Sequence, residues 1–436
     1  MCAAAPSSPP RIAVTGVGGY SRHHHLTLQR LEAAGLCRVV ATCDPAGHAA
    51  QPENAELRVA ERGVRVYPDF PAMLEGIAGA ADAVTLPTPI HLHAPMHRAC
   101  VERGLPVYLE KPPTLWWEEL EEMIAMDARA VRPTEVGFNF TTEPARQALK
   151  ARLVAGEFGA LKAAAFWGSW PRPASYFTRN AWAGKLFVPG SPVPLLDSCA
   201  GNAMGHFVQN LLFWAGTSQA GFAAIRDVRA CLYRAHAIVG ADTVFAEART
   251  ETGVTLRFGG THASGPPKEE HVESVWCERA RWRYVTGREC EIIWTDGRRE
   301  HFDLRAEGDW QERNFRLYFK YLAGEPAAPV NSLASCRTFV AFNDLLYGAT
   351  PGIMPVAGEQ VETTGDEVHG VYRAIRGIVP ALRNFAEEGH WPDAANYGWA
   401  REPGVAHAAD LPLVAVKLRA LAARICKTAD KNGVPA

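Results

Sequence analysis

The stretch Leu109-Glu110-Lys111-Pro112-Pro113 places a carboxylate and an amine side by side, directly after a short apolar run. An amine in this place can donate a hydrogen bond to a bound ligand, and two prolines stiffen the backbone that carries it. If the apolar run is a strand of a parallel sheet, Lys111 stands at its carboxyl end, where ligands of such sheets bind. We therefore expect Lys111 and Glu110 to face a ligand rather than open solvent.

A second candidate site is the turn Gly16-Val17-Gly18-Gly19-Tyr20-Ser21, which follows an apolar run and opens a helix. Glycines in such a turn let the backbone approach a pyrophosphate, and the N–H groups of the helix N-terminus stabilise its charge. Ser21 stands where a third glycine is usual. The motif by itself is weak, because a tight turn without a ligand has the same composition.

Asp44 strengthens the nucleotide interpretation, since it ends the second apolar run after the helix that follows the turn. A carboxylate there binds both ribose hydroxyls of NAD and repels the 2′-phosphate of NADP. The sequence therefore predicts an NAD site formed by the glycine turn, with Tyr20 and Arg22 beside it, and by Asp44. Arg22 is the residue that would serve NADP if that cofactor were bound instead.

Two histidine-containing stretches flank this predicted site. In "LPTPIHLHAPM", Thr88 and His91 line the cofactor pocket, or else Thr88 caps the helix expected over 91–104. The run His23-His24-His25 falls in the first helical turn, where adjacent side chains point in different directions and cannot converge on one ion. We expect surface histidines there, and no metal site.

Aromatic rings and forked donors are concentrated in "WGSWPRPASYFTRNAWAGK". Flat indoles suit the apolar faces of sugar rings, and arginines suit hydroxyls or a carboxylate. We interpret the group as a carbohydrate pocket, although ordinary interface packing explains any single member equally well. Its members are Trp170, Arg172, Tyr176, Arg179, Asn180 and Trp182. His262 belongs either to the same pocket or to the surrounding sheet.

The stretch "LLDSCAGNAMGHFVQNLLFWAG" joins polar residues to an apolar helix expected over 202–213. The i, i+4 spacing puts Asn202 and His206 on one face of that helix. Asp197, in the loop before it, either hydrogen-bonds a sugar hydroxyl or caps the helix. A lone histidine in such a helix is usually a core residue, so the spacing by itself assigns no function.

Short strands and helices must position these residues. Five apolar runs separated by amphipathic stretches predict a parallel sheet covered by helices over 1–140, the α/β Rossmann arrangement that binds dinucleotides. From 141 the pattern changes to β-rich stretches with turns at Thr252-Gly253 and Asp296-Gly297, which predict hairpins. We expect 141–436 to form an α+β domain with a large, mostly antiparallel open sheet. Helical periodicity over 368–385 and 413–425 predicts a helical C-terminal extension.

Composition limits the class of protein. The 436 residues are 47% hydrophobic and 21% charged with a net charge of −2, which favours a small-molecule ligand over a nucleic acid. We find no signal peptide, and no apolar stretch reaches the roughly 18 residues of a membrane span. Ten scattered cysteines without CxxC pairs indicate free thiols in a reducing cytoplasm.

The glycine turn, Asp44 and the block "TPIHLHAPMHRACVERGLPVYLEKPP" resemble the Gfo/Idh/MocA oxidoreductases, whose E-K-P signature stands here at Glu110-Lys111-Pro112. The resemblance extends in order over nearly all of residues 11–350. It implies that Lys111 holds the reacting hydroxyl of the substrate and that His206 handles its proton. It also implies that the exposed face of the second sheet packs against another subunit, in a homodimer or homotetramer.

Asn202 departs from the family pattern, which has an aspartate four residues before the histidine, and Gln209 departs from an acidic residue three after it. An aspartate stabilises a protonated imidazole, whereas an asparagine only orients it. Three explanations stay open. The base is weaker, another carboxylate such as Asp197 takes the role, or the reaction involves no net oxidation.

We expect an NAD-dependent oxidoreductase that removes a hydride from a secondary hydroxyl of a sugar, polyol or sugar derivative. One alternative is a redox-neutral glycoside hydrolase that retains NAD through oxidation, elimination, hydration and reduction. The other is a non-catalytic NAD-binding protein, against which the intact Lys111 and His206 argue.

Overall fold

The computed structural model of the chain describes residues 8–266, 269–325, 330–366, 368 and 370–432. These residues form two compact units. The first unit contains 8–114, 119–142 and 308–336, and the second contains 115–118, 143–307 and 337–432.

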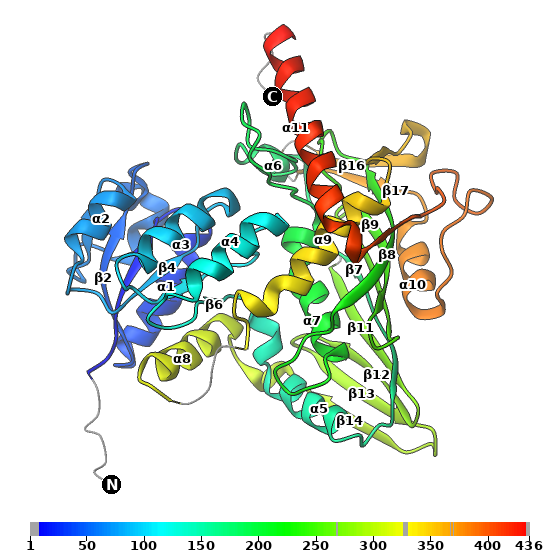
Figure 1. The fold of residues 1–436 in the computed structure, drawn as a ribbon, viewed down its shortest axis with the longest axis horizontal. Helices are drawn as coiled ribbons and strands as arrows, with labels where there is room; N and C mark the ends of the chain where they lie inside the picture. The colour runs from blue at the N-terminus through cyan, green and yellow to red at the C-terminus, as the bar shows by residue number, and fades with distance from the viewer. Residues whose placement is uncertain (1–7, 267–268, 326–329, 367, 369, 433–436) are drawn as a thin grey trace. The chain divides into compact units, whose positions relative to one another are not determined.

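The first unit is built on a six-stranded parallel sheet in the order β3-β2-β1-β4-β5-β6, with its elements drawn mostly in blue and cyan (Figure 1). The strands are β1 (Arg11–Thr15), β2 (Arg38–Cys43), β3 (Arg65–Tyr67), β4 (Ala83–Leu86), β5 (Val107–Leu109) and β6 (Glu135–Val136). The helices between them are α1 (Tyr20–Ala33), α2 (Phe70–Gly76), α3 (His93–Val101) and α4 (Trp117–Asp127). This strand order, with helices between consecutive strands, confirms the predicted Rossmann arrangement.

Helix α8 (Trp310–Leu322) also belongs to the first unit, although it comes long after the other parts in the sequence. Its Phe315 and Tyr318 are buried in one cluster with Ile12 and Val14 of β1. The predicted domain boundary at residue 140 placed this helix in the second domain, whereas the structure places it in the first unit. The reason is that the aromatic side of α8 completes the core of the first unit.

The second unit contains a ten-stranded sheet in the order β14-β13-β12-β11-β7-β10-β9-β8-β15, to which β18 adds by pairing with β8. The strands are β7 (Leu161–Ser169), β8 (Ile225–Arg234), β9 (Thr243–Thr250), β10 (Thr255–Thr261), β11 (Glu270–Cys277), β12 (Ala280–Val285), β13 (Glu289–Trp294), β14 (Arg299–Asp303), β15 (Met354–Pro355) and β18 (Gly404–His407). Pairing is antiparallel except between β7 and β10 and between β8 and β15. Gly253 and Gly297 have positive φ in the hairpin turns β9–β10 and β13–β14, as their positions predicted.

Both faces of this sheet are covered over its central strands. Phe166 of β7 stacks on Phe207 of α7 (Gly205–Ala215), with ring centroids 4.2 Å apart. The next residue, Trp167, points the other way because side chains alternate along a strand, and it lies in one buried cluster with α10 (Ile378–Glu388). The sheet face that the sequence led us to expect exposed is thus partly covered by the chain's own C-terminal part.

The C-terminal part is less helical than predicted. The helix predicted over 368–385 is wrong in its first half, where β17 (Gly370–Ile375) forms a strand and pairs with β16 (Val361–Asp366). The positive φ of 70° at Gly377 separates this hairpin from α10, which it precedes as N-cap. Helix α11 (Leu411–Asn432) confirms the helix predicted over 413–425 and packs on α9 (Arg337–Ala349). None of the described helices combines the length and apolar composition needed to cross a membrane.

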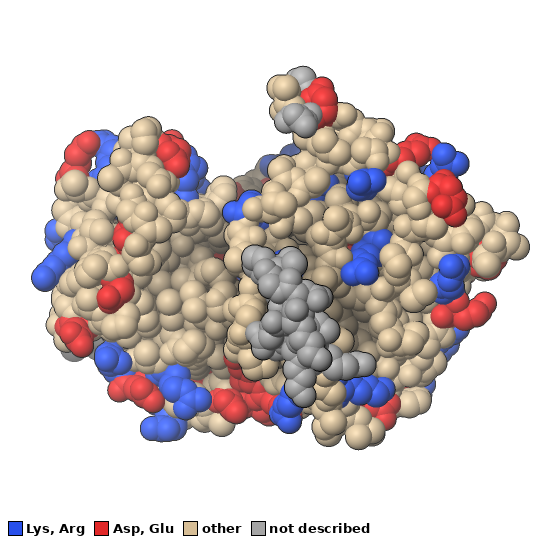
Figure 2. All heavy atoms as spheres, turned by 90° about the horizontal axis from the view of Figure 1, so that it is seen from above, with Lys and Arg blue, Asp and Glu red and all other residues tan. Residues whose placement is uncertain are grey.

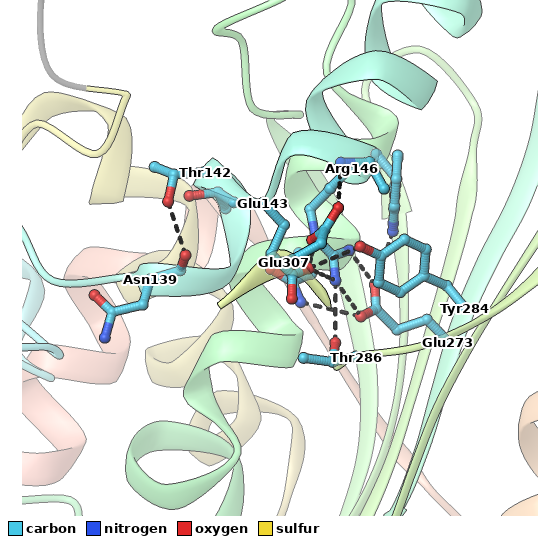
Figure 3. A network of polar contacts seen from close by, with 12 residues as sticks. Asn139, Thr142, Glu143, Arg146, Glu273, Tyr284, Thr286 and Glu307 are labelled. Atoms are coloured by element: carbon cyan, nitrogen blue, oxygen red, sulfur yellow. Dashed lines mark hydrogen bonds and ion pairs between the residues drawn. The ribbon is translucent and has the colours of Figure 1, made fainter. Parts of the chain in front are cut away.

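A buried ionic network joins α5 (Pro144–Val154) to the sheet of the second unit (Figure 3). Arg146 on α5 donates from its two terminal nitrogens to Glu273 at 2.7 and 2.9 Å, and from Nε to Glu143 at 3.1 Å. The Tyr284 hydroxyl donates to Glu143 at 2.9 Å. The three charged side chains are fully buried. Removing these charges from water costs free energy, and the bidentate Arg146–Glu273 pair offsets that cost. An unpaired buried charge would have no such compensation.

Charges of both signs are mixed on the surface. Figure 2 shows Lys and Arg side chains interspersed with Asp and Glu over the face in view. On the outer strands, Arg283 pairs with Glu289 and Arg299 pairs with Glu291. Such pairs between exposed side chains add little stability and leave no strong field of one sign on these strands.

Candidate functional site

The turn between β1 and α1 ends in a helix N-terminus that no side chain caps. Gly19 is the N-cap of α1 without a side-chain hydrogen bond, and the first turn of α1 carries no acidic residue. Gly16 and Gly19 have φ of 85° and 56°, a region that L side chains rarely adopt. Backbone N–H groups presented in this way suit a phosphate.

Two close contacts require small residues in the turn. A Cβ on Gly18 would lie 2.6 Å from Nδ1 of His48, and a Cβ on Gly16 would lie 2.7 Å from Oγ of Ser21. Ser21 Oγ lies 2.9 Å from the carbonyl oxygen of Thr15 and 3.3 Å from that of Pro87. Ser21 therefore takes the place of the third glycine and ties the end of β1 to the end of β4.

Asp44, directly after β2, has one carboxylate oxygen engaged and one available. Its Oδ2 accepts from the backbone N–H of Ala49 at 2.6 Å. Its Oδ1 is buried without a hydrogen-bond partner among the described residues, and Nδ1 of His48 stands 3.7 Å from it. A buried acceptor with unmet capacity fits a ribose hydroxyl. The glycine turn and Asp44 thus fit the pyrophosphate and ribose of NAD.

Arg22 and Tyr20 flank the turn and differ in their contacts. Arg22 forms an ion pair with Glu56 and donates from Nε to the Glu53 carbonyl oxygen at 3.2 Å. Because Glu56 already neutralises it, Arg22 is poorly suited to bind a 2′-phosphate. Tyr20 is 46% exposed, and its ring centroid lies 5.8 Å from that of His24.

The prediction of surface histidines is wrong for two of the three. His24 and His25 are fully buried, and only His23 is exposed. Nε2 of His25 lies 3.1 Å from the carbonyl oxygen of Gly16 in the turn. His24 stands four residues before Leu28 on the inner face of α1, a helical spacing that could have revealed its burial.

Glu110 supports the sheet edge from inside the unit. Its buried carboxylate has Oε1 2.9 Å from Nε2 of His24, and Oε2 accepts from the backbone N–H of Lys111 at 3.1 Å. Both oxygens are engaged, which suits holding the Lys111 backbone better than the cofactor contact we expected. Lys111 is half-buried after β5, and a cis peptide bond joins it to Pro112.

His93, which we had not singled out, links the loops after β4 and β5. Its Nε2 lies 2.8 Å from the carbonyl oxygen of Thr88, and its Nδ1 lies 3.0 and 3.2 Å from those of Pro112 and Pro113. His93 is 1% exposed. Nothing in the sequence distinguishes it from His91, because the contact depends on two loops that meet only in the folded sheet.

Thr88 does not cap the following helix, so that alternative is wrong. Its hydroxyl donates to the sulfur of Met96 at 3.6 Å, and Leu92 precedes α3 as an N-cap without a side-chain bond. His91 is half-buried in the same loop, and burial lowers the pKa of its imidazole. Thr88 and His91 follow β4, next to β5 in the sheet, so they stand at the same carboxyl edge as Lys111.

The second unit contains a pocket that collects four of the predicted residues, Tyr176, Asp197, Asn202 and His262. About 230 Å³ of free space, part of it open solvent, lies among these residues, so the pocket itself is small. Its other described lining residues are Phe177, Gly184, Ser198, Cys199, Ala203, Ile238 and Ala241. The mixture of rings, a carboxylate, an amide and an imidazole suits a polyhydroxylated ligand.

Asp197 and Asn202 form a hydrogen-bonded pair in this pocket. Asp197 Oδ1 accepts from the Asn202 amide at 2.8 Å, and Oδ2 accepts from the backbone N–H of Gly184 at 2.6 Å. Ser198, and not Asp197, caps the following helical turn by accepting from Gly201 at 3.0 Å. The capping alternative for Asp197 is therefore wrong. The chain places a carboxylate beside Asn202, at the helix where the family pattern has its aspartate.

Asn202 and His206 do not share one regular helix. Asn202 lies in a π-helix (Cys199–Ala203), whereas His206 is the second residue of α7, so the predicted α-helical face is wrong. Both side chains are half-buried, and Gln209 is fully buried. Lys150 donates to three backbone carbonyl groups at the C-terminal end of α7, which anchors the helix that carries His206.

Five predicted residues form a continuous stack of rings and guanidinium groups, which we call the arginine–aromatic stack. Arg172 lies over the rings of Trp170 and Tyr176, 4.3 and 4.6 Å from their centroids. Arg179 lies 3.4 Å from the centroid of Tyr176 and 5.7 Å from that of Trp182. Tyr176 stands on the short helix α6 (Ala174–Thr178) and also lines the pocket. Cation–π contacts hold both arginines against the rings.

Asn180 and His262 have backbone contacts. Asn180 Oδ1 accepts from the N–H groups of Trp182 and Ala183 at 3.1 and 2.8 Å, so it shapes the turn after α6. Nδ1 of His262 lies 2.8 Å from the carbonyl oxygen of Trp170, and burial lowers the pKa of its imidazole to about 3. His262 is therefore neutral and donates from Nδ1. Among the described residues, no group of three or more His, Cys, Asp or Glu side chains is arranged to hold a metal ion.

Comparison with known proteins finds relatives for part of the chain. The family model of an oxidoreductase family with an NAD-binding Rossmann fold matches residues 10–138. Inositol 2-dehydrogenase 1 of Saccharopolyspora erythraea is 32% identical over 184 residues, which cover 42% of this chain and 49% of the relative. D-apiose dehydrogenase of Paraburkholderia graminis is 32% identical over 163 residues, or 36% of this chain and 38% of the relative. The chain thus matches about half the length of these curated relatives or less.

Solved structures share the fold over more of the chain. The WlbA dehydrogenase from Chromobacterium violaceum, in complex with NADH and UDP-GlcNAcA, has a TM-score of 0.65 at 21% identity, covering 79% of this chain and 94% of that one. UDP-N-acetylglucosamine 3-dehydrogenase GnnA from Acidithiobacillus ferrooxidans has a TM-score of 0.59 at 21% identity, covering 77% and 95%. At these identities the likeness shows a common fold.

Proposed function

Residues 10–138 belong to the Gfo/Idh/MocA oxidoreductase family, and from this membership we propose that the whole chain is an NAD-dependent oxidoreductase. Its substrate is a sugar, polyol or sugar derivative that loses a hydride at a secondary hydroxyl. The names of the curated relatives, inositol and apiose dehydrogenases, support this substrate class. The observation that carries the proposal is the position of Lys111, at the same sheet edge as the glycine turn.

Lys111 is well supported for this role. Glu110 accepts its backbone N–H, and His24 lies behind Glu110. On the other side, His93 stands within hydrogen-bond distance of the carbonyl groups of Pro112 and Pro113. An amine on a backbone held at both ends is preorganised to stabilise charge that develops on a hydroxyl oxygen.

Bound NAD supplies the hydride acceptor, and the residues of the chain bind the hydroxyl and move its proton. Lys111 donates a hydrogen bond to the reacting hydroxyl oxygen, and His206 takes the proton as general base. Asp197 already accepts hydrogen bonds on both oxygens, from Gly184 and Asn202. We therefore assign Asp197 to positioning Asn202 and to binding a hydroxyl that does not react.

The proposal is tested by following NADH absorbance with a panel of polyols, sugars and aryl glycosides, together with release of the aglycone. Lys111→Ala should abolish turnover and leave NAD affinity within about tenfold, or about 1.4 kcal/mol, because the amine serves the substrate. Lys162→Ala is the matched control, since that exposed lysine pairs with Glu278 on the surface of the second unit. Undiminished turnover in Lys111→Ala would sink the catalytic assignment, and release of aglycone without net NADH would favour glycoside cleavage.

We further propose that the protein is a homodimer or homotetramer in the cytoplasm. Eight of the ten cysteines, from Cys37 to Cys336, are free thiols in the structure, which suits a reducing compartment. Since α10 covers much of one sheet face, the subunit contact needs apolar surface elsewhere. Light scattering after size-exclusion chromatography measures the assembly directly.

A further inference from the structure

Arg172 is half-buried, and its Nε has no hydrogen-bond acceptor among the described residues. This Nε is buried, and the carboxylate that acts on the guanidinium is the exposed Glu269. Burial lowers the pKa of this guanidinium, which Trp170 and Tyr176 contact with their rings. Aromatic faces attract the cation without replacing a hydrogen-bond acceptor, so the buried Nε–H stays available for a ligand.

Arg172 stays charged at neutral pH, whereas the histidines that face it do not. Burial, with a contribution from Arg172 itself, lowers the pKa of His262 to about 3 and that of His271 to about 4, so both are neutral. Arg179 adds a second positive charge, and the exposed Glu269 is the carboxylate that acts on Arg172 from the surrounding residues. At Arg172 an anion would therefore meet two guanidinium groups and one exposed carboxylate, while Asp197 and Asp242 lie farther along the pocket beside Asn202 and His236.

Arg172 borders the pocket of the second unit. Its backbone N–H donates to the carbonyl oxygen of His262 at 3.1 Å, and its guanidinium stacks on Tyr176. His262 and Tyr176 are both pocket-lining residues. The same pocket contains Asp197 and its hydrogen-bonded amide partner, which suit neutral hydroxyls. The pocket thus combines groups for hydroxyls with a neighbouring cation.

We infer that Arg172 binds an anionic group of the substrate, so that the preferred substrate is a sugar acid or a sugar phosphate. This inference rests on the proposed function and deepens it. A guanidinium group binds a carboxylate or a phosphate with two parallel hydrogen bonds. The rings of Trp170 and Tyr176, on which the Arg172 guanidinium stacks, hold the plane of this group in place. A neutral sugar would leave these donors unpaired and lose the charge-assisted bonds.

The experiment compares matched substrates, each neutral sugar of the panel with its uronate and its phosphate ester. We expect kcat/KM for one acidic form to exceed that of the neutral sugar by about tenfold or more. Arg172→Gln should lower kcat/KM for the acidic form at least about tenfold more than for the neutral sugar, and Arg172→Lys should restore part of the preference, since an ammonium keeps the charge without the fork. Arg299→Gln is the control, because Arg299 pairs with Glu291 on the outer strands.

The outcomes separate this inference from the proposed function. Turnover of neutral and acidic forms at equal rates, or an equal loss for both in Arg172→Gln, overturns the anion site and leaves the oxidoreductase intact. If no sugar is oxidised, the proposed function fails, and calorimetric titration with uronates and with inorganic phosphate still tests the site. Binding that disappears in Arg172→Gln supports it and identifies carboxylate or phosphate as the preferred group. Absence of binding by wild-type protein overturns it.

Discussion

Replacement of Asp44 by serine should change which dinucleotide the protein binds. The Asp44 side chain is 3% exposed, and among the described residues only its Oδ2 has a hydrogen-bond donor, the N–H of Ala49. A 2′-phosphate on the ribose would bring negative charge to this carboxylate. Two unit charges about 4 Å apart repel by about 1 kcal/mol in water and about 4 kcal/mol at an effective dielectric constant near 20.

Since 1.4 kcal/mol is a factor of ten, this repulsion predicts that NADP binds about five- to a thousandfold more weakly than NAD. Asp44→Ser removes the repulsion and also removes hydrogen bonds to the NAD ribose, each worth about 1.5–3 kcal/mol when an acceptor is charged. NAD affinity should therefore fall while NADP affinity rises, and the ratio of the two dissociation constants should approach one. Arg22 should not reverse the preference, because Glu56 neutralises it.

Titration of the intrinsic fluorescence with NADH and NADPH, at one ionic strength, measures both constants. Asp69→Ser is a suitable control, because Asp69 caps α2 in the same unit by accepting from Ala72 at 2.8 Å. That variant should keep both the stability, because serine caps a helix about as well as aspartate does, and the ratio of the two dissociation constants. Equal affinities in the wild type, or an unchanged ratio in Asp44→Ser, would refute the electrostatic reasoning.

Two further predictions concern the second unit. Asn202→Asp should place a second carboxylate against Asp197, where the amide now donates at 2.8 Å. The two carboxylates should then share a proton at pH values where a single carboxylate has lost it, because two adjacent negative charges repel. The pH–rate profile should therefore gain an ionisation well above pH 4. A profile without this ionisation would show that the pair takes no part in the reaction. Arg146→Met should lower the free energy of unfolding by about 3–5 kcal/mol, because Glu273 would stay buried without its cation. Urea denaturation measures the free energy of unfolding of this variant and of the control Arg283→Met. The control should change it by less than about 1 kcal/mol, because Arg283 and its partner Glu289 are exposed.

Local patterns were sufficient for the nucleotide site. Strands β1, β2, β4 and β5 are short and largely buried, whereas the edge strand β3 exposes Arg65 and Val66. Short buried runs of this kind indicate a parallel sheet before their partners are known. Gly16 and Gly19 need positive φ, and Asp44 follows the next strand, so spacing along the chain is enough to bring them to one edge. The carbohydrate-type residues Tyr176, Asp197 and His262 were also recognisable by type, and they do line one pocket.

Side-chain partners were less predictable than side-chain types. Asp197 had two interpretations in the sequence, and only the bond to Asn202 and the cap by Ser198 exclude helix capping. His93 gains its contacts because the loops after β4 and β5 meet. A π-helix instead of the first α-helical turn separates Asn202 from His206, and its backbone hydrogen bonds leave no periodic signal in five residues.

By itself, the sequence determined the Rossmann sheet, the glycine turn, Asp44 and the position of Lys111, because each depends on burial or backbone geometry within a few residues. Tertiary structure alone decided that α8 completes the first unit, that His24 lies behind Glu110 and that α10 covers the second sheet. The physical reason is that an amphipathic pattern records how much apolar surface a segment must bury, but many distant segments could satisfy that need equally. Which of them does so depends on shape and on the closing of long loops, and these are properties of the whole folded chain.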